Sequence, residues 1–97
     1  MQLLRSTTYR ADLEIIVDYI ARDSPAAALK MWEEIETQVE MLKLYQDAGR
    51  PGRVEGTREL VISRTPFIVA YRKLGDAVCL VRVLHGAQQW PKQMPMR

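Results

Sequence analysis

A glycine-rich segment, DAGRPGRVEG at residues 47–56, divides this chain into two parts whose hydrophobic periods differ. Its three glycines and one proline prevent a helix or strand from continuing through it, so we interpret it as a plain connecting loop. Before this segment the apolar residues recur with the period of a helix, and after it they alternate as in strands. The sequence therefore predicts an α+β fold in which helices precede most of the sheet.

Two helices are predicted before the loop. The first covers about residues 9–21, and QLLR ahead of it is a candidate edge strand. The second starts after Ser24, which can cap the free amides of a first turn, and Pro25 suits the first helical position because it has no amide to leave unpaired. Its apolar stripe, which we expect to pack into the core, is Ala28, Met31, Trp32, Ile35, Val39 and Leu42. The two helices form an αα-hairpin.

Three strands are predicted after the loop, TRELVIS, FIVAYRK and AVCLVRVLH, and their short connections imply an antiparallel meander. In the last strand, alternation places Val78, Leu80, Arg82 and Leu84 on one face and Cys79, Val81, Val83 and His85 on the other. Both faces are mostly apolar, which indicates a central strand. The helix hairpin then covers one face of the sheet, and the other face is left for a partner or for the tail after residue 85.

The length of 97 residues predicts a single domain, 1–97, with residues 92–97 as a flexible tail. Hydrophobic residues make up 47% and charged residues 27%, and no apolar run approaches the roughly 20 residues of a membrane span. Charges interrupt the N-terminal segment where a signal peptide would need an apolar core, so we expect a cytoplasmic protein. One cysteine, Cys79, and one histidine are too few for an internal disulfide or a typical metal site, and no cofactor is predicted.

The net charge of +2 conceals an asymmetry between the two halves of the chain. Residues 1–46 carry 5 Lys/Arg against 8 Asp/Glu, a net −3, whereas residues 47–97 carry 9 against 4, a net +5. A basic half favours an anionic partner, either nucleic acid or an acidic protein segment. Solvated surface charge without such a role is the alternative interpretation.

His85 is the first candidate for chemistry, because a general acid or base at neutral pH is most often histidine. No hydroxyl or thiol nucleophile accompanies it, but the 2′-OH of an RNA substrate would serve as one. The cations that would then hold the phosphate are Arg58, Arg64, Arg72 and Arg82, spread over the three strands. In the alternative, His85 ends a strand by bonding to a nearby backbone group, and the arginines are solvated or ion-paired. Trp90 is either a base-stacking platform or a latch for the tail.

Four stretches of the chain carry a family resemblance: YRADLEIIVDYIARDSPAAALKMWEEI, GRPGRVEGTREL, FIVAYR and VRVLHGAQQWP. The first is similar to the helix hairpin of the RelE/ParE family of bacterial toxins, and the others are similar to the loop and last two strands of that family. The likeness covers about residues 2–91. It implies a β-α-α-β-β-β fold with the helix hairpin on one face of a small, mostly antiparallel sheet. It also implies growth inhibition, plasmid stabilization and a place in a type II toxin–antitoxin system.

The family combines two activities on one fold. RelE-type members are mRNA interferases, endonucleases that act in the ribosome, and for this activity the candidate catalytic residues are His85, Arg82, Arg64 and Arg58. ParE-type members inhibit DNA gyrase without cleavage chemistry. This chain has no tyrosine after His85, and Phe67 begins a strand in which some nucleases carry a catalytic arginine. The long hairpin and the ending VRVLH look more like the ParE group, so the resemblance favours a gyrase inhibitor, with His85 as a structural strand end.

The resemblance also implies partners. A cognate antitoxin would wrap its C-terminal segment around the toxin and fold on binding, either at a strand edge or in a helix groove. As a gyrase inhibitor, the chain would contact its target through the basic half and the tail, with Arg50, Arg53, Arg72 and Trp90 as the candidate target-binding residues. As a nuclease, its partners would instead be the ribosome and mRNA.

Overall fold

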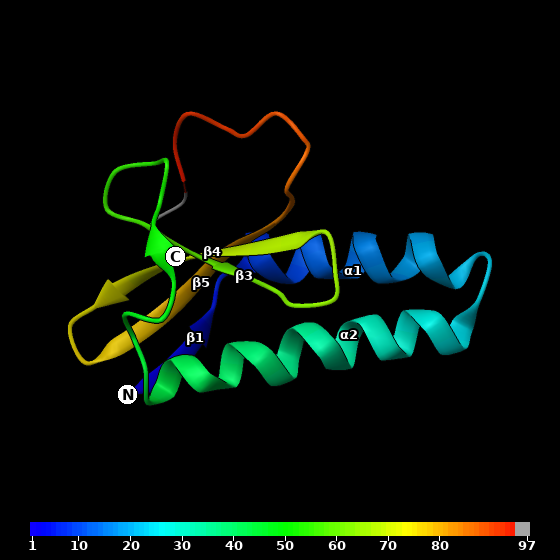
Figure 1. Cartoon of the computed structure of the whole chain (residues 1–97), viewed down its shortest axis with the longest axis horizontal. Coiled ribbons are helices and arrows are strands. Elements are labelled where there is room, and N and C mark those ends of the chain that lie inside the picture. Colours follow the sequence, from blue (N-terminus) through cyan, green and yellow to red (C-terminus); the bar gives the residue numbers. More distant parts are fainter. Residues whose placement is uncertain (95–97) are drawn as a thin grey trace.

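The computed structural model describes residues 1–94. The elements are, in chain order, β1 (Gln2–Arg5), α1 (Thr7–Ala21), α2 (Pro25–Val39), the 3₁₀ helix η1 (Glu40–Lys43), β2 (Arg50–Pro51), β3 (Arg58–Val61), β4 (Phe67–Leu74) and β5 (Ala77–His85). The two helices lie side by side and antiparallel, and the tip of their hairpin projects beyond the sheet (Figure 1). The sheet has the order β1-β5-β4-β3-β2, in which β1 pairs parallel with β5 and the other pairs are antiparallel. The predicted α+β fold is confirmed.

Serine caps start both helices. Ser6 Oγ accepts the Tyr9 amide at 2.9 Å and also donates to the Val81 carbonyl at 3.0 Å, so one hydroxyl caps α1 and ties it to β5. This cap starts α1 at Thr7, two residues before the predicted position. Ser24 Oγ accepts the Ala27 amide at 3.1 Å, and Pro25 occupies the first turn of α2 as predicted.

The glycine-rich loop contains a short strand that the sequence analysis did not predict. β2 pairs with β3 through Arg50↔Glu59 and Pro51↔Arg58, and the Gly52 amide donates to the Thr57 carbonyl at 2.8 Å. Gly52 fits because a Cβ there would lie 2.2 Å from Thr57 Oγ1. The interpretation of residues 47–56 as a plain connector is therefore wrong, because the loop folds back and adds an edge strand to the sheet.

A β-bulge changes the faces of β5 from those predicted. Ala70 lies opposite Arg82 but the next residue, Tyr71, lies opposite Leu80, which leaves Val81 as an extra residue. An extra residue reverses the alternation that follows it. Val83 therefore joins Val78 and Leu80 in the core under the helices, and Leu84 joins Cys79 and Val81 on the opposite face, so the predicted faces are wrong beyond the bulge.

Each face of the sheet has its own hydrophobic cluster. The main core lies between the helices and the sheet and contains Tyr9, Leu13, Ile35, Val39, Leu42, Leu60, Ile62, Val69, Tyr71, Val78, Leu80 and Val83. On the second face Ala70, Cys79, Val81 and Leu84 are covered by buried Met94, with partly buried Trp90 packed against them. The sequence predicts that either a partner or the tail covers this face, and in the structure the tail covers it. Residues 95–97 of the predicted flexible segment 92–97 lie outside the described residues.

Trp32 does not pack into the core as predicted. Its side chain is 44% exposed, whereas Ile35 and Val39 of the same helix are fully buried. Ile35 and Val39 lie on the flank of α2 that faces the sheet, and Trp32 lies on the flank beside α1. The prediction of a continuous buried stripe was wrong at this residue because the stripe is wider than the contact that the sheet makes with α2.

Candidate functional site

The four candidate nuclease residues lie around the rim of the helix-bearing face. Arg82 and His85 share a hollow of ≈170 Å³ with Asp12, Phe67 and other residues. Arg58 lies at the opposite end of the sheet, because it pairs with Tyr71 whereas His85 pairs with Phe67. Four residues along β4 correspond to about 13 Å. The structure thus brings Arg82 and His85 together and leaves Arg58 apart from them.

Asp12 of α1 holds Arg82 through two hydrogen bonds, Nε to Oδ2 at 2.7 Å and Nη2 to Oδ1 at 3.1 Å. Oδ2 also accepts the backbone amide of Val83 at 2.9 Å. Both side chains are largely buried. A bidentate pair of this kind fixes the orientation of the guanidinium, and here it joins the first helix to the last strand.

His85 bonds to the backbone at the end of β5. Its Nδ1 accepts the Ala87 amide at 3.0 Å, its own amide donates to Gln88 Oε1 at 2.7 Å, and its ring meets Phe67 edge-on at 5.7 Å. An Nδ1 that accepts an N–H has no proton, so the neutral ring carries its proton on Nε2. This geometry is that of a side chain that closes the turn after a strand.

The remaining two candidates have partners of their own. Arg64 lies in the β3–β4 turn with a positive φ of 67°, and its guanidinium forms an ion pair with Glu34 of α2. The hydrogen bonds from Arg64 and Gln38 hold the pKa of Glu34 below its usual range. Arg58 Nη1 donates to the Gly49 carbonyl at 2.6 Å. Neither guanidinium is directed at the hollow beside His85.

The four candidate target-binding residues gather on the other face, where the loop 47–56 meets the tail. Glu59 is only 2% exposed and accepts bonds from both Arg50 and Arg53 at 3.0–3.1 Å. The Arg53 guanidinium stacks over the Trp90 ring at 3.6 Å from its centroid. Arg72 Nη2 donates to the Met94 carbonyl at 3.3 Å. We call Arg50, Arg53, Glu59, Arg72 and Trp90 the loop–tail cluster.

Glu59 holds this cluster together although sequence reasoning did not single it out. Burial alone would raise the pKa of Glu59, but the amide and guanidinium of Arg53 and the guanidinium of Arg50 outweigh burial and lower it. The carboxylate is therefore ionised at neutral pH. Its position in TRELVIS carries no signal for this role, because the two arginines that it binds reach it only when the loop folds back as β2.

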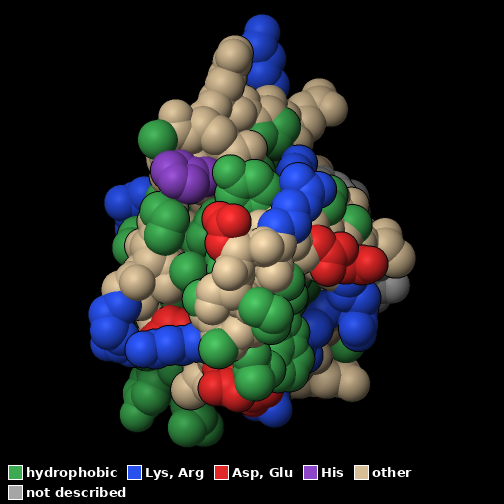
Figure 2. All heavy atoms as spheres, turned by 90° about the vertical axis from the view of Figure 1, so that its right-hand side faces the viewer, with side chains coloured by type: hydrophobic (Ala, Val, Ile, Leu, Met, Phe, Trp, Pro, Cys, Tyr) green, Lys and Arg blue, Asp and Glu red, His purple; other side chains and the backbone are tan. Residues whose placement is uncertain are grey.

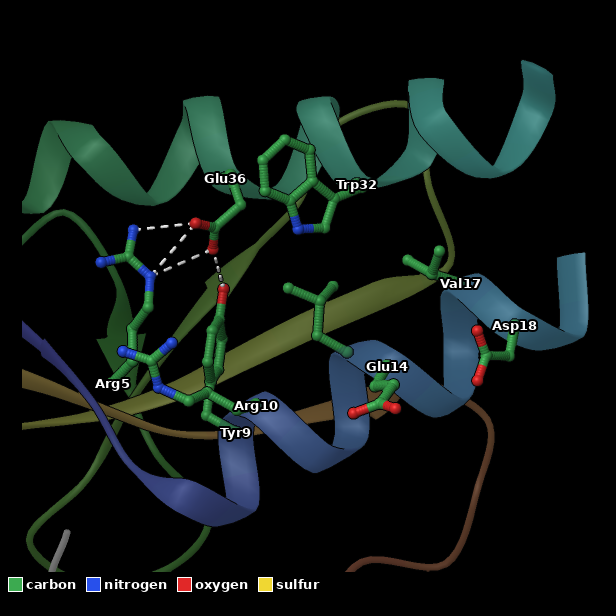
Figure 3. A pocket seen from close by; sticks show the side chains of 9 residues that line it. Arg5, Tyr9, Arg10, Glu14, Val17, Asp18, Trp32 and Glu36 are labelled. Atoms are coloured by element: carbon green, nitrogen blue, oxygen red, sulfur yellow. Dashed lines mark hydrogen bonds and ion pairs between the residues drawn. The ribbon is translucent and has the colours of Figure 1, made fainter. Parts of the chain in front are cut away.

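A hollow of ≈580 Å³ lies in the groove between α1 and α2 (Figure 3). At one end Glu36 accepts a hydrogen bond from Tyr9 Oη at 2.7 Å and forms an ion pair with Arg5 at 2.9 Å. Burial and the bond to Glu36 raise the pKa of Tyr9 far above its ordinary value, so the phenol stays protonated. The residues that line this helix groove are Arg5, Tyr9, Arg10, Leu13, Glu14, Val17, Asp18, Trp32 and Glu36.

The residues that line the helix groove were not among the candidate site residues predicted from the sequence. Glu36 lies on the charged side of the predicted second helix, and its partners Arg5 and Tyr9 come from a segment about thirty residues earlier. The spacing of Trp32 and Glu36, four residues apart, is a signal that the two share one flank of a helix.

Among residues 1–94 there is no cluster of three or more His, Cys, Asp or Glu suited to a metal ion. Within the same residues, none of the helices has the length and apolar character that crossing a membrane requires.

The sequence of this chain is similar to known proteins of one family. The family model described as the ParE toxin of the type II toxin–antitoxin system parDE matches residues 3–90. The Y4kP protein of Sinorhizobium fredii, a toxin by name, is 44% identical over 80 residues, which cover 82% of each chain. Toxin RelE2 of Caulobacter vibrioides is 36% identical over 78 residues, which cover 80% of this chain and 86% of that protein.

Solved structures agree with the sequence relatives. A chain from the chromosomal ParDE toxin–antitoxin system of P. aeruginosa superposes with a TM-score of 0.81 at 35% identity, covering 88% of this chain and 95% of the other. A chain from the RelBE2 toxin–antitoxin complex of Mycobacterium tuberculosis has a TM-score of 0.52 at 24% identity, which shows a shared fold alone. The chain described here therefore belongs to the ParE toxin family of type II toxin–antitoxin systems.

Proposed function

We propose that this chain inhibits growth as a ParE-like inhibitor of DNA gyrase, acts in the cytoplasm without cleaving RNA, and is neutralised by a cognate antitoxin. One observation carries the proposal against nuclease activity. A ribonuclease site needs a base, an acid and cations directed at a single phosphate. In this chain Arg82 is held by Asp12, Arg64 is paired with Glu34, and His85 Nδ1 is occupied by a backbone amide.

The family supports the same proposal. The matched family model and the P. aeruginosa structure both bear the ParDE name, and the structural match is at 35% identity over most of both chains. Fold alone does not separate the two activities of the wider superfamily. The proposal for this chain therefore depends on two points. The four candidate nuclease residues already have partners within the protein, and the matched family model and structure are those of ParDE systems.

We assign the contact with gyrase to the loop–tail cluster. Arg50, Arg53 and Trp90 lie together there, and Glu59 already positions the guanidinium groups of both arginines. An arginine held by a buried carboxylate loses little side-chain entropy when it binds a partner. Tryptophan and arginine are also the residues that most often dominate binding energy at protein interfaces.

The second candidate function is ribosome-dependent cleavage of mRNA. The relative named Toxin RelE2 favours it, as does the hollow that Arg82 and His85 share. For this activity Arg82 would have to exchange Asp12 for a phosphate when RNA binds. Loss of toxicity in both an Arg82 and a His85 variant that still fold is its expected signature.

The test is a gyrase supercoiling assay with purified components. Relaxed plasmid, gyrase and ATP are incubated with and without this protein, and the products are examined for loss of supercoiling and for trapped cleavage complexes. The parallel assay measures mRNA cleavage on translating ribosomes by primer extension. Inhibition of gyrase without mRNA cleavage supports the proposal, and mRNA cleavage without any effect on gyrase overturns it in favour of the nuclease.

A further inference from the structure

Three large apolar side chains are exposed just after α2 ends. Met41, Leu44 and Tyr45 are 43%, 75% and 62% exposed, and they line one hollow of ≈480 Å³ together with Asp47 and neighbouring residues. This apolar hollow lies at the end of the helix hairpin that is remote from its tip (Figure 1). A single exposed apolar residue needs no explanation, but three around one hollow are typical of an interaction surface.

A second hollow, of ≈280 Å³, adjoins the first and is basic. Its lining residues are Pro51, Gly56, Thr57, Arg58, Tyr71 and Lys73. The two hollows meet at Asp47, which lines the apolar one and forms bridges to Arg58 Nε at 3.5 Å and to Lys73 Nζ at 3.4 Å. Within residues 1–94 neither cation forms a salt bridge with another carboxylate. One carboxylate therefore faces two cations, which leaves an excess of one positive charge.

Asp47 holds these two cations only loosely. Its side chain is 68% exposed, and both bridges are longer than the about 2.7–2.9 Å of a charge-assisted hydrogen bond. Exposed ion pairs of this kind contribute at most about 1 kcal/mol to stability. The fold therefore loses little when a carboxylate from another protein takes the place of Asp47.

The surroundings of Asp47 are fixed before any partner binds. Tyr71 Oη donates to the Gln46 carbonyl at 2.7 Å and accepts the Gly49 amide at 2.9 Å, so the chain on both sides of Asp47 is attached to β4. Arg58 Nη1 donates to the Gly49 carbonyl at 2.6 Å, which orients its guanidinium. A group that is oriented beforehand loses little conformational entropy on binding. The basic hollow is thus prepared for an anionic group.

The apolar hollow favours a protein over a nucleic acid as the anionic partner. The backbone of DNA presents phosphates that Arg58 and Lys73 can hold, but it offers no apolar side chain for the hollow at Leu44 and Tyr45. Protein interfaces commonly combine an apolar centre with a polar and charged rim. A protein segment that carries a carboxylate beside an apolar side chain fits both hollows.

The two hollows are continuous with the loop–tail cluster. Pro51 lines the basic hollow and directly follows Arg50, and a Cβ on Gly56, which also lines it, would lie 2.8 Å from Arg72 Nη1. Both arginines belong to the loop–tail cluster, so the β2 edge connects the two sites. At the hairpin tip, by contrast, hydrophobic side chains lie among charged ones without such a division (Figure 2). Continuity assigns the hollows to the same partner as the cluster.

From these observations we propose that Asp47 occupies the place of a carboxylate from gyrase. An acidic side chain of the target displaces Asp47 from Arg58 and Lys73, and an apolar side chain beside it enters the apolar hollow. This inference rests on the proposed function. It adds a second contact, the chemistry of the segment that is recognised and an internal carboxylate that competes with the target. We call this site the Asp47 surface, and its residues are Met41, Leu44, Tyr45, Asp47, Arg58 and Lys73.

The variant Asp47→Asn tests the competition directly, because its expected effect is a gain. Removal of the competing carboxylate frees Arg58 and Lys73 for the target, so binding to gyrase should become about three- to tenfold tighter. The matched control Asp23→Asn removes the same charge at an exposed position in the turn between the helices. It should bind within about twofold of the wild type, which separates a local effect from a change in net charge.

Two further variants test the groups that contact the target. Lys73→Gln and Leu44→Ala should each weaken binding about fivefold or more. Their controls, at exposed positions of α2, are Lys30→Gln and Leu29→Ala. In the double variant Asp47→Asn/Lys73→Gln the gain from Asp47→Asn should shrink, because one of the two freed cations is gone. The probe is purified gyrase holoenzyme without DNA. Its binding is measured by biolayer interferometry on variants whose urea unfolding matches that of the wild type.

The outcomes distinguish this inference from the proposed function. If the wild type inhibits gyrase but Asp47→Asn, Lys73→Gln and Leu44→Ala all bind like it, the function stands and the Asp47 surface is not part of the contact. Weaker binding of Asp47→Asn would also overturn the inference, because Asp47 itself would then contact the target. If the variants change only the affinity for purified antitoxin, or for plasmid DNA alone, the surface serves that partner instead. If the wild type neither binds nor inhibits gyrase, the proposed function fails and this inference with it.

Discussion

Asp12 and Arg82 are seventy residues apart in the chain, yet the carboxylate binds both the guanidinium and the backbone amide that follows it. The pair attaches α1 to β5 at the bulge. It also engages Arg82, which a nuclease would need for its substrate. It has a direct consequence for stability.

Replacing Asp12 by Ala should lower the free energy of unfolding by about 2–3 kcal/mol, because it leaves a largely buried guanidinium and one amide without their acceptor. Arg82→Ala should cost less, since the carboxylate keeps the Val83 amide. Urea denaturation measures both, and the double variant completes a cycle. If the two single effects simply add, the side chains are not coupled and the interpretation of the pair as structural is wrong.

Glu59 should make stability depend on pH. Its pKa in the folded protein lies below the ordinary glutamate value of 4.5, so the carboxylate stabilises the fold fully above that value and progressively less as the pH falls through the folded pKa. Chemical denaturation at pH 7 and at successively lower pH should show this loss. Glu59→Gln should be less stable than the wild type at pH 7 and show a smaller decrease on acidification. An unchanged slope would mean that other carboxylates dominate.

Tyr71 should hold the loop that precedes β2. Its hydroxyl donates to the Gln46 carbonyl at 2.7 Å and accepts the Gly49 amide at 2.9 Å. Tyr71→Phe removes both bonds and should destabilise the fold by about 1–3 kcal/mol. Hydrogen exchange should show faster exchange of the Gly49 amide. Gly49→Ala is expected to be at least as harmful, because its Cβ would lie 2.7 Å from the Tyr71 ring.

Trp90 should protect the second face of the sheet. Trp90→Ala removes the ring that stacks on Arg53 and packs against the hydrophobic cluster that contains buried Cys79. We therefore expect faster labelling of the Cys79 thiol and a loss of about 1–2 kcal/mol in the free energy of unfolding. Trp32→Ala is the control, because Trp32 lies in the helix groove on the other side of the molecule. Equal labelling rates in the two variants would contradict the role of the tail as a cover.

His85 should be dispensable for growth inhibition. His85→Ala and His85→Gln are expected to remain toxic when expressed without antitoxin and to unfold within about 0.5 kcal/mol of the wild type, since the residue is exposed. The measurements are colony counts after induction and urea denaturation. Loss of toxicity in a folded His85→Gln protein would instead favour a role as acid or base.

Local sequence signals determined the elements of this protein. The Ser24 cap followed by Pro25 marks the start of α2, and alternation over AVCLVRVLH predicts β5 over the residues that the structure assigns to it. Such signals act within a few residues along the chain, where the free amides of a first turn or the period of a strand decide the conformation. The number and order of the main elements could therefore be predicted before any contact between them was known.

Tertiary structure alone decided the candidate binding surfaces. The bulge at Val81, the exposure of Trp32, the Asp12–Arg82 pair and the joining of Arg50 and Arg53 by Glu59 each depend on residues brought together from distant segments. Alternation along one strand does not reveal where a partner strand has one residue fewer, and a helical stripe does not reveal how much of its width a sheet covers. The helices and strands of this protein follow from its local sequence, whereas the helix groove and the loop–tail cluster exist only because packing selects which of its charged and aromatic side chains meet.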